Sequence, residues 1–310
     1  MPPAREGTDQ ECPEIRRKNR RFAGNLNRRS KRSNCLDFAL HAAGRVVVQN
    51  SAVRRAGRMT VIAVRTLFAA LALFCTALDA APAPTVVVEL FTSEGCSSCP
   101  PADALLQQLG AASVDGVRVI ALGEHVDYWD HQGWRDRFSS ASLTHRQEIY
   151  AARFNNESIY TPQLVVDGRS ELVGSDAAGA RRAIDRAAAA SHGTVSIAAA
   201  ESGGRVSIDV RVSGLPARHE PAEVVIGITE DGLSSKVTRG ENHGRVLSHA
   251  AVVRQLVAIG DATDESAAAH REVTLEPEWS RPRLTIVAFV QERRSRRILA
   301  SSAIPLVPRP

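Results

Sequence analysis

Cysteine is scarce in this chain, and several familiar catalytic signatures are missing from it. The 310 residues include five cysteines, of which Cys96 and Cys99 alone form a close pair. No second pair exists to complete a closed four-ligand zinc site. The sequence also lacks a phosphate-binding loop, a Gly-x-Ser-x-Gly motif and a His-Glu-x-x-His motif. These absences argue against nucleotide hydrolysis, serine hydrolysis and zinc-dependent proteolysis.

Positive charge is concentrated at the start of the chain. The formal net charge is +5, but residues 1–58 hold fourteen basic and five acidic residues, a net of +9. Residues 59–310 hold twenty-five basic and twenty-nine acidic residues, a net of −4. The basic balance therefore does not indicate that the folded part binds nucleic acid. We predict that residues 1–58 precede the true start of translation or form a disordered tail, rather than a nucleic-acid-binding arm.

Residues 59–80 have the pattern of a secretory signal peptide. The pattern consists of Met59, the positive Arg65, the apolar run 67–78 and the small residues Ala80 and Ala81. A run of about twelve apolar residues is too short to span a bilayer comfortably. We therefore predict a periplasmic or secreted protein with no stable membrane span after signal cleavage; an uncleaved N-terminal anchor is the alternative.

Cys96 and Cys99 lie at a turn between an apolar β-branched run, residues 85–91, and a helical pattern, residues 100–109. A thiol at a helix N-terminus meets unpaired N–H groups and the positive end of the helix dipole, which favour thiolate. A second thiol three residues later closes a disulfide and resolves mixed disulfides. We expect Cys96 to attack from an exposed helix end and the more buried Cys99 to resolve. In an oxidising compartment such a pair is more suited to catalysis or metal binding than to stapling.

The order of elements over residues 85–192 predicts a thioredoxin-like α/β domain. The predicted strands are residues 85–91, 117–122, 163–166 and a short one near 172–173, and the predicted helices are 100–109, 142–154 and 177–190. A helical crossover makes the first two strands parallel. Residues 194–307 contain many strand patterns and few helical ones, which predicts a second, all-β, sandwich-like domain.

Thr161 and Pro162 directly precede the third predicted strand. In thioredoxin-like folds a cis-proline in this place faces the Cys-x-x-Cys pair, and the residue before it offers backbone hydrogen bonds to a bound peptide. Most X–Pro bonds are trans, so the dipeptide alone says little. Residues 163–176, however, resemble the corresponding glutaredoxin segment. We predict a cis bond that faces Cys96 and binds substrate, and the resemblance implies small thiols such as glutathione among the partners.

The loop 123–138 is rich in polar and aromatic residues and leaves the carboxyl end of the second predicted strand. It should lie at the same sheet edge as the cysteines, where ligands bind in open α/β sheets. His125 is a candidate for moving protons or for completing a copper site with Cys96 and Cys99, and ordinary loop packing is the plain alternative. Asp127 is an accessory candidate with no assigned chemistry. Glu124 would raise the pKa of His125 if their side chains lie close.

Five stretches resemble DUF1223, a secreted bacterial family of unknown function. They are residues 88–103, 125–130, 160–163, 240–244 and 287–291. Taken by itself, the stretch 240–244 is interpreted as an ordinary polar turn between strands. The resemblance covers about residues 85–306 and implies a thioredoxin-like domain followed by a β-rich domain, but it implies no substrate.

Together these observations predict an exported thiol–disulfide oxidoreductase-like protein. Cys96 is the expected nucleophile, Cys99 the resolving thiol, and Thr161 with Pro162 the peptide-binding turn. The expected partners are protein thiols or disulfides, or small thiols; no cofactor, metal or nucleic acid is predicted. Two alternatives stay open: a copper-handling protein that uses Cys96, Cys99 and His125, and a non-catalytic binding module whose Cys-x-x-Cys is vestigial.

Overall fold

The computed structural model describes residues 83–111, 113–190 and 192–307. The predicted N-terminal extension, residues 1–58, and the predicted signal peptide, residues 59–80, lie outside the described residues. Within the described part, no helix is both long and apolar enough to cross a bilayer.

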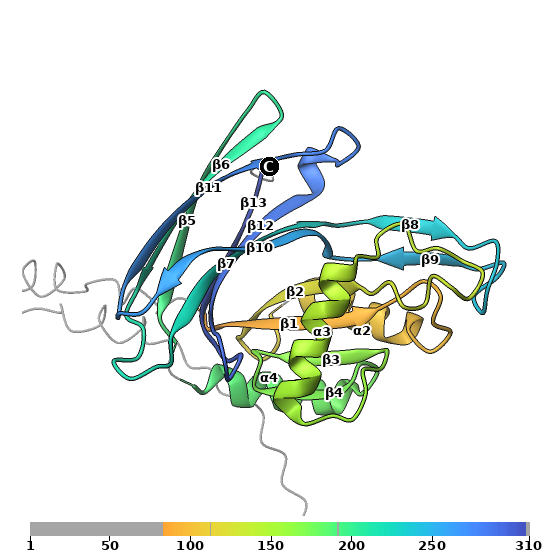
Figure 1. Cartoon of the computed structure of the whole chain (residues 1–310), viewed down its shortest axis with the longest axis horizontal. Coiled ribbons are helices and arrows are strands. Elements are labelled where there is room, and N and C mark those ends of the chain that lie inside the picture. The colour runs from red at the N-terminus through yellow and green to blue at the C-terminus, as the bar shows by residue number, and fades with distance from the viewer. Residues whose placement is uncertain (1–82, 112, 191, 308–310) are drawn as a thin grey trace, which may run out of the picture. The chain divides into compact units, whose positions relative to one another are not determined.

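The first half of the described chain alternates strands with helices, and the second half is almost entirely strand (Figure 1). The first half contains β1 (Thr85–Thr92), α2 (Pro100–Ala111), β2 (Arg118–His125), α3 (Ala141–Phe154), β3 (Gln163–Val166), β4 (Ser170–Val173) and α4 (Ala177–Ala188). The second half contains β5 (Thr194–Ser202), β6 (Arg205–Ser213), β7 (Ala222–Glu230), β8 (Leu233–Lys236), β9 (Val246–His249), β10 (Val252–Ala262), β11 (Ala267–Thr274), the 3-10 helix η1 (Arg281–Arg283), β12 (Leu284–Glu292) and β13 (Ile298–Pro305).

One eight-stranded mixed sheet takes strands from both halves, in the order β13-β12-β7-β10-β2-β1-β3-β4. β1 and β2 are parallel, and β10 joins β2 in parallel where Val252 lies opposite Gly123. Position 123 has to be glycine for this approach, because a Cβ there would lie 3.0 Å from the backbone oxygen of Ala250. A three-stranded sheet, β11-β6-β5, and the hairpin β8-β9 contain the other described strands.

The predicted fold class is wrong. We expected a thioredoxin-like α/β domain over residues 85–192 and a separate sandwich-like all-β domain over residues 194–307. The predicted elements of the first half do form in the predicted order. However, β10, β7, β12 and β13 continue the sheet beyond β2, and the described chain is mostly strand, so no separate α/β core exists. Local periodicity predicts strands but not the distant partners with which they pair.

Different helices cover the two faces of the sheet. On one face, α2 and α4 pack through Leu106 and Ile184 against β1 and β3. On the other face, α3 packs through Leu143 against a core that includes β10 and β12. Consecutive residues of a strand point to opposite faces. The consecutive residues Glu124 and His125 of β2 therefore point to opposite faces of the sheet and meet different charged partners.

The boundaries of α3 and α4 come from short-range capping. The Ser140 side chain accepts a hydrogen bond from the Ser142 N–H, so Ser140 is the N-cap of α3, which begins one residue before the predicted helix 142–154. Asn155 ends α3 in the left-handed conformation, with φ 57°. The Asp176 carboxylate accepts a hydrogen bond from the Gly179 N–H at 2.9 Å and begins α4.

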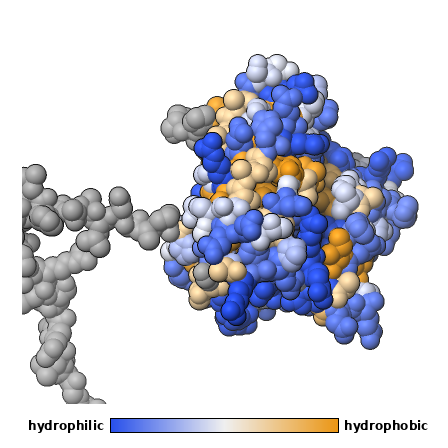
Figure 2. All heavy atoms as spheres, turned by 60° about the vertical axis from the view of Figure 1, so that its left-hand side comes forward, coloured by the Kyte–Doolittle hydropathy of each residue, from blue (hydrophilic) through white to orange (hydrophobic). Residues whose placement is uncertain are grey.

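The face drawn in Figure 2 is largely hydrophilic, with apolar side chains gathered near its middle. Among the described residues, the large hydrophobic side chains that are well exposed are Val173, Val246 and Val307. Val173 belongs to β4, which is the edge strand of the eight-stranded sheet. Most of the apolar surface is therefore buried in the cores described above.

Candidate functional site

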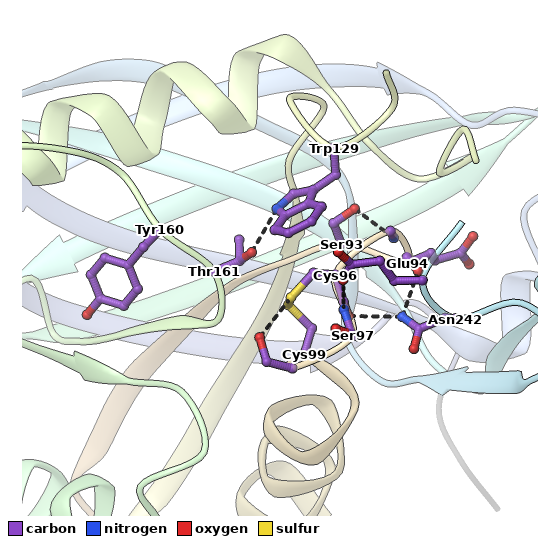
Figure 3. The surroundings of a disulfide bond; sticks show 12 residues. Ser93, Glu94, Cys96, Ser97, Cys99, Trp129, Tyr160, Thr161 and Asn242 are labelled. Carbon is purple, nitrogen blue, oxygen red and sulfur yellow. Dashed lines mark hydrogen bonds between the residues drawn. A yellow bond between two sulfur atoms is a disulfide. The ribbon is translucent and has the colours of Figure 1, made fainter. Parts of the chain in front are cut away.

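Cys96 and Cys99 form a disulfide in the turn between β1 and α2 (Figure 3). We call residues 93–99 the CxxC turn. The Cys99 N–H donates to the Cys96 carbonyl at 3.3 Å, and the Ala102 N–H donates to the Cys99 carbonyl at 2.8 Å. These bonds place Cys99 at the start of α2, so the predicted strand–CxxC–helix arrangement is observed.

Both cysteines are completely covered. Cys96 and Cys99 are each 0% exposed, whereas Ser97 and Ser98 between them are exposed. The expectation that Cys96 lies at an exposed helix end is therefore wrong. The Ser98 hydroxyl lies 3.3 Å from the Cys96 sulfur and forms part of the cover. A partner reaches either sulfur only after local movement of the covering groups.

Trp129 connects the CxxC turn to Thr161, and Figure 3 shows its ring on the same side of the disulfide as Thr161. The indole N–H donates to the Thr161 hydroxyl at 2.8 Å. The Trp129 backbone approaches Gly95, where a Cβ would lie 3.0 Å from the Cβ of Trp129. Glycine at position 95 therefore allows the Trp129 loop to lie against the CxxC turn.

The Thr161–Pro162 peptide bond is cis, as predicted. The Pro162 carbonyl accepts a hydrogen bond from the Gly174 N–H at 2.9 Å. A Cβ at Gly174 would lie 2.9 Å from the Pro162 Cβ and 3.0 Å from the Ala102 Cβ, so Pro162 and α2 converge on this glycine. A direct contact between Pro162 and Cys96, and a role in peptide binding, stay predictions.

The turn 240–244 between β8 and β9 holds the CxxC turn in place. Asn242 is fully buried, and its Nδ2 donates to the carbonyls of Glu94 and Cys96, each at 2.9 Å. Glu241 accepts a hydrogen bond from the Ser97 N–H at 3.1 Å, and its bonds with Ser97 lower the pKa of its carboxyl. We had interpreted this stretch as an ordinary turn. Its place among the family-like stretches was the signal that it does more.

Five buried titratable residues lie in or beside the CxxC turn. We call them the histidine cluster: Glu94, Asp103, His125, Asp136 and His249. The His125 Nδ1 is 2.6 Å from Asp136 Oδ2, and the His249 Nε2 is 3.1 Å from Glu94 Oε1. The two imidazole rings meet edge to face, with centroids 4.8 Å apart. Two carboxylate–histidine pairs thus contact each other through their rings.

Asp103 connects this cluster to α2. It follows Cys99 by four residues, and its N–H donates to the Cys99 carbonyl at 3.1 Å, so Asp103 lies in the first turn of α2, directly after the disulfide. Burial raises the pKa of Asp103, although the neighbouring His125 and His249 oppose this rise. Burial lowers the pKa of His125, but the neighbouring carboxylates of Asp136, Asp103 and Glu94, with Asp136 foremost, raise it overall. The cluster therefore favours protonated forms at two of its members.

Of the two accessory candidates, the structure brings His125 into this cluster but not Asp127. The Asp127 N–H donates to the Thr144 hydroxyl at 3.1 Å, and that hydroxyl donates back to Asp127 Oδ1 at 2.6 Å. Asp127 therefore fastens its loop to α3. The condition under which Glu124 would raise the pKa of His125 is not met, because Glu124 points to the opposite face; Asp136 is the main group that raises it.

The donors of the copper hypothesis are not grouped as ligands. Among the described residues, no three His, Cys, Asp or Glu side chains are placed to hold a metal ion. The sulfurs of Cys96 and Cys99 are bonded to each other, and the Nδ1 of His125 is paired with Asp136. The copper hypothesis therefore gains no geometric support.

A second buried polar group, which sequence reasoning did not foresee, lies on the α3 face of the sheet. We call it the arginine cluster: Glu89, Glu124, Arg146, Tyr150 and Gln291. The Arg146 Nε lies 2.6 Å from Glu89 Oε2 and 3.5 Å from Glu124 Oε1. The Tyr150 hydroxyl donates to Glu89 at 2.5 Å and accepts from the Gln291 amide at 2.8 Å.

The two carboxyls of the arginine cluster have opposite pKa shifts. Burial and the neighbouring Glu89 carboxylate raise the pKa of Glu124 well above its ordinary value. Burial opposes ionisation of Glu89 as well, but Arg146 lowers the pKa of Glu89 overall. The single guanidinium thus favours the ionised form of Glu89, whereas the surroundings of Glu124 favour its protonated form.

A family model described as a protein of unknown function, DUF1223, matches residues 87–291, so the chain belongs to this family. A comparison with curated proteins gives no match. A crystal structure of an Agrobacterium tumefaciens protein is 25% identical, with a TM-score of 0.56, and the match covers 73% of this chain and 96% of that one. HBP35 of Porphyromonas gingivalis is 15% identical, with a TM-score of 0.53 and coverage of 72% and 75%, which shows a shared fold alone.

Proposed function

We propose that this DUF1223 protein is an exported thiol–disulfide oxidoreductase in which Cys96 and Cys99 alternate between dithiol and disulfide. The observation that carries the proposal is a disulfide at the start of α2 that adjoins a buried group of acids and histidines. A helix N-terminus stabilises a thiolate, and thiolates are the reactive form in exchange. The signal-like pattern of residues 59–80 supports export, and an exported disulfide can persist.

In the proposed reaction a partner thiolate attacks the Cys96 sulfur, the bond between Cys96 and Cys99 breaks, and Cys99 leaves as a thiolate. A second thiol of the partner then attacks the mixed disulfide. This step releases reduced Cys96 and a partner disulfide, so two electrons pass from the partner dithiol to the protein. The reverse sequence reduces a partner disulfide.

Cysteine substitutions in the exported protein test this proposal. Cys99→Ser should leave Cys96 free to attack but remove the resolving thiol, so partners should accumulate covalently on Cys96. Cys96→Ser should trap almost nothing, and the double variant is the matched control. Adducts from periplasmic extract are resolved on non-reducing gels and identified by mass spectrometry. Equal trapping by both single variants would show that the roles are assigned wrongly.

A structural disulfide in a non-catalytic binding module is the second candidate, because both cysteines are fully buried. Such a disulfide should resist dithiothreitol under native conditions and become reducible only when the protein unfolds. Measuring the reduction rate against denaturant concentration separates the two candidates. A redox-active pair is reduced in the absence of denaturant, after a local opening that exposes Cys96.

A further inference from the structure

We propose that the histidine cluster is a buried proton relay for the disulfide, in which Asp103 exchanges a proton with Cys99 and the two histidines resupply Asp103. This inference rests on the proposed thiol–disulfide exchange. It adds to that exchange the acid–base residues that a covered sulfur needs.

The position of Asp103 is the first argument. Asp103 is 9% exposed, four residues after Cys99 on α2, and forms no salt bridge with a lysine or arginine among the described residues. An ionised carboxylate without such a partner is costly to bury. Asp103 is therefore suited to hold a proton, and its raised pKa agrees with this.

The arrangement of the histidines is the second argument. Asp136 occupies Nδ1 of His125, and Glu94 occupies Nε2 of His249, so each carboxylate fixes one ring nitrogen. The other nitrogen of His249, Nδ1, is buried and finds no hydrogen-bond partner in the described part of the chain. Buried polar atoms are seldom left unpaired without a reason. A nitrogen that takes and gives a proton during turnover provides one.

The carboxylates of the cluster are themselves fixed by the surrounding backbone and by Trp134. The Trp134 indole N–H donates to Glu94 Oε2 at 2.8 Å. Asp136 accepts from the N–H groups of Glu94 and Phe138, each at 2.9 Å. These bonds hold both carboxylates in place as acceptors beside the two imidazole rings. The titratable groups that face Asp103 are thus His125, His249 and Asp136.

The proton balance of the proposed step is as follows. A partner thiolate forms a bond to the Cys96 sulfur, and the electron pair of the broken disulfide moves to the Cys99 sulfur. A thiolate is disfavoured in a fully buried place. The Asp103 carboxyl therefore gives its proton to Cys99 and becomes a carboxylate. A protonated histidine of the cluster then returns a proton to Asp103.

The test measures reduction of the disulfide in the full exported chain by dithiothreitol, from pH 5 to pH 9. Each rate is divided by the fraction of the reductant that is thiolate. For the wild type we expect this normalised rate constant to fall as pH rises, because the relay loses its proton. Asp103→Asn should be about 100-fold slower at pH 6, the lower end of what general acid–base catalysis contributes, and independent of pH. His249→Gln should give a curve of normalised rate constant against pH that is shifted from that of the wild type.

His192→Gln is the matched control. His192 is also paired with a carboxylate, Asp167 at 3.0 Å, but it belongs to neither cluster. Its curve should coincide with that of the wild type. Circular dichroism and cooperative unfolding check that each variant folds, and the solvent deuterium isotope effect on the wild-type rate reports proton transfer without any substitution.

The outcomes separate the two proposals. A flat wild-type curve without an isotope effect overturns the relay, as do Asp103→Asn and His249→Gln curves that match the wild type; exchange itself then stands. If the wild type is not reduced without denaturant, the proposed function fails and the relay fails with it. If Asp103→Asn does not fold, the wild-type curve, its isotope effect and His249→Gln decide the question.

Discussion

The two buried clusters lie on opposite faces of one sheet, and consecutive residues of β2, Glu124 and His125, belong to different ones. In the arginine cluster the cation is a guanidinium, which stays protonated in proteins. In the histidine cluster the carboxylates are paired instead with imidazoles, the side chain whose ordinary pKa lies nearest to neutral pH. The first arrangement suits a fixed structural charge, and the second suits proton exchange beside the disulfide. The type of basic side chain therefore distinguishes the face with a fixed charge from the face on which we propose proton exchange.

Removing the fixed charge should produce the largest effect on stability. Arg146→Met leaves the buried Glu89 and Glu124 carboxyls without a cation, and we expect a loss of about 3–5 kcal/mol in the free energy of unfolding. Urea denaturation measures this loss. The control is Arg205→Met, which breaks the exposed pair with Glu272 and should cost less than about 1 kcal/mol. Equal losses would show that the arginine cluster is not a structural clamp.

The pH dependence of stability sharpens the same comparison. The pKa of Glu124 is raised in the folded state. Its contribution to folding stability is therefore complete below its ordinary pKa of 4.5 and is lost as pH rises toward the folded pKa. Glu124→Gln removes this loss. From pH 5 to 7 we expect the free energy of unfolding of Glu124→Gln to rise, relative to that of the wild type, by up to about 1.4 kcal/mol per pH unit. Urea denaturation at each pH measures this difference.

Glu89→Gln should change the pH dependence of stability in the opposite direction. The pKa of Glu89 is lowered, so its contribution is present above the unfolded value and is lost as pH falls through the folded pKa. The variant should therefore be least stable, relative to the wild type, at neutral pH, and the gap should narrow in acid. Identical pH profiles for the two variants would contradict the assignment of one protonated and one ionised carboxyl.

Loosening the turn that holds the disulfide should have a smaller effect on stability. Asn242→Ala leaves the buried carbonyls of Glu94 and Cys96 without their donor, at a cost of about 1–3 kcal/mol. It should also accelerate reduction of the disulfide by dithiothreitol, because the CxxC turn then opens more easily. His243→Ala, at an exposed position of the same turn, should change neither quantity.

The sequence could predict what is local about this site but not what is distant. Cys96, Cys99 and the start of α2 lie within one turn, so strand, turn and helix patterns were sufficient to place them. Asn242 comes from a hairpin far along the chain. His249 ends β9, which the structure separates from β10 with Ala251 at φ 50°. This break was invisible to residue periodicity, and it explains why His249 was not among the candidates.

The burial of charged residues in the arginine cluster could not be predicted from the sequence pattern either. Glu89 lies within an apolar run, and Glu124 was considered only for its neighbour in sequence, His125. Nothing local indicates that Arg146, on α3, reaches both carboxyls. Sequence patterns assign burial to apolar residues. A buried ion pair between a helix and a strand can therefore be recognised only once the tertiary fold is known.

The smallest expected effect comes from the hydrogen bond between the Trp129 indole and Thr161, which lies near the disulfide (Figure 3). Trp129→Phe keeps a ring but removes the bond to Thr161, which contributes about 1 kcal/mol. Reduction by dithiothreitol should become roughly fivefold faster if this bond breaks in the opening step. Thr161→Val removes the same bond from the other side. The double variant should be no faster than either single one, and additive rates would contradict a shared cause.

The pairing of β10 with β2 joins a segment from late in the chain to the first strands of the site. In an exported chain that emerges N-terminus first, the CxxC turn reaches the oxidising compartment before residues 240–252 have been translocated. The sulfurs are then still open to oxidants, and the edge of β2 is still unpaired. The later segment closes both at once: Asn242 secures the CxxC turn, and β10 occupies the edge. If the chain is exported as proposed, its disulfide can therefore form before Asn242 and β10 are in place, and this later segment then determines how accessible the disulfide stays.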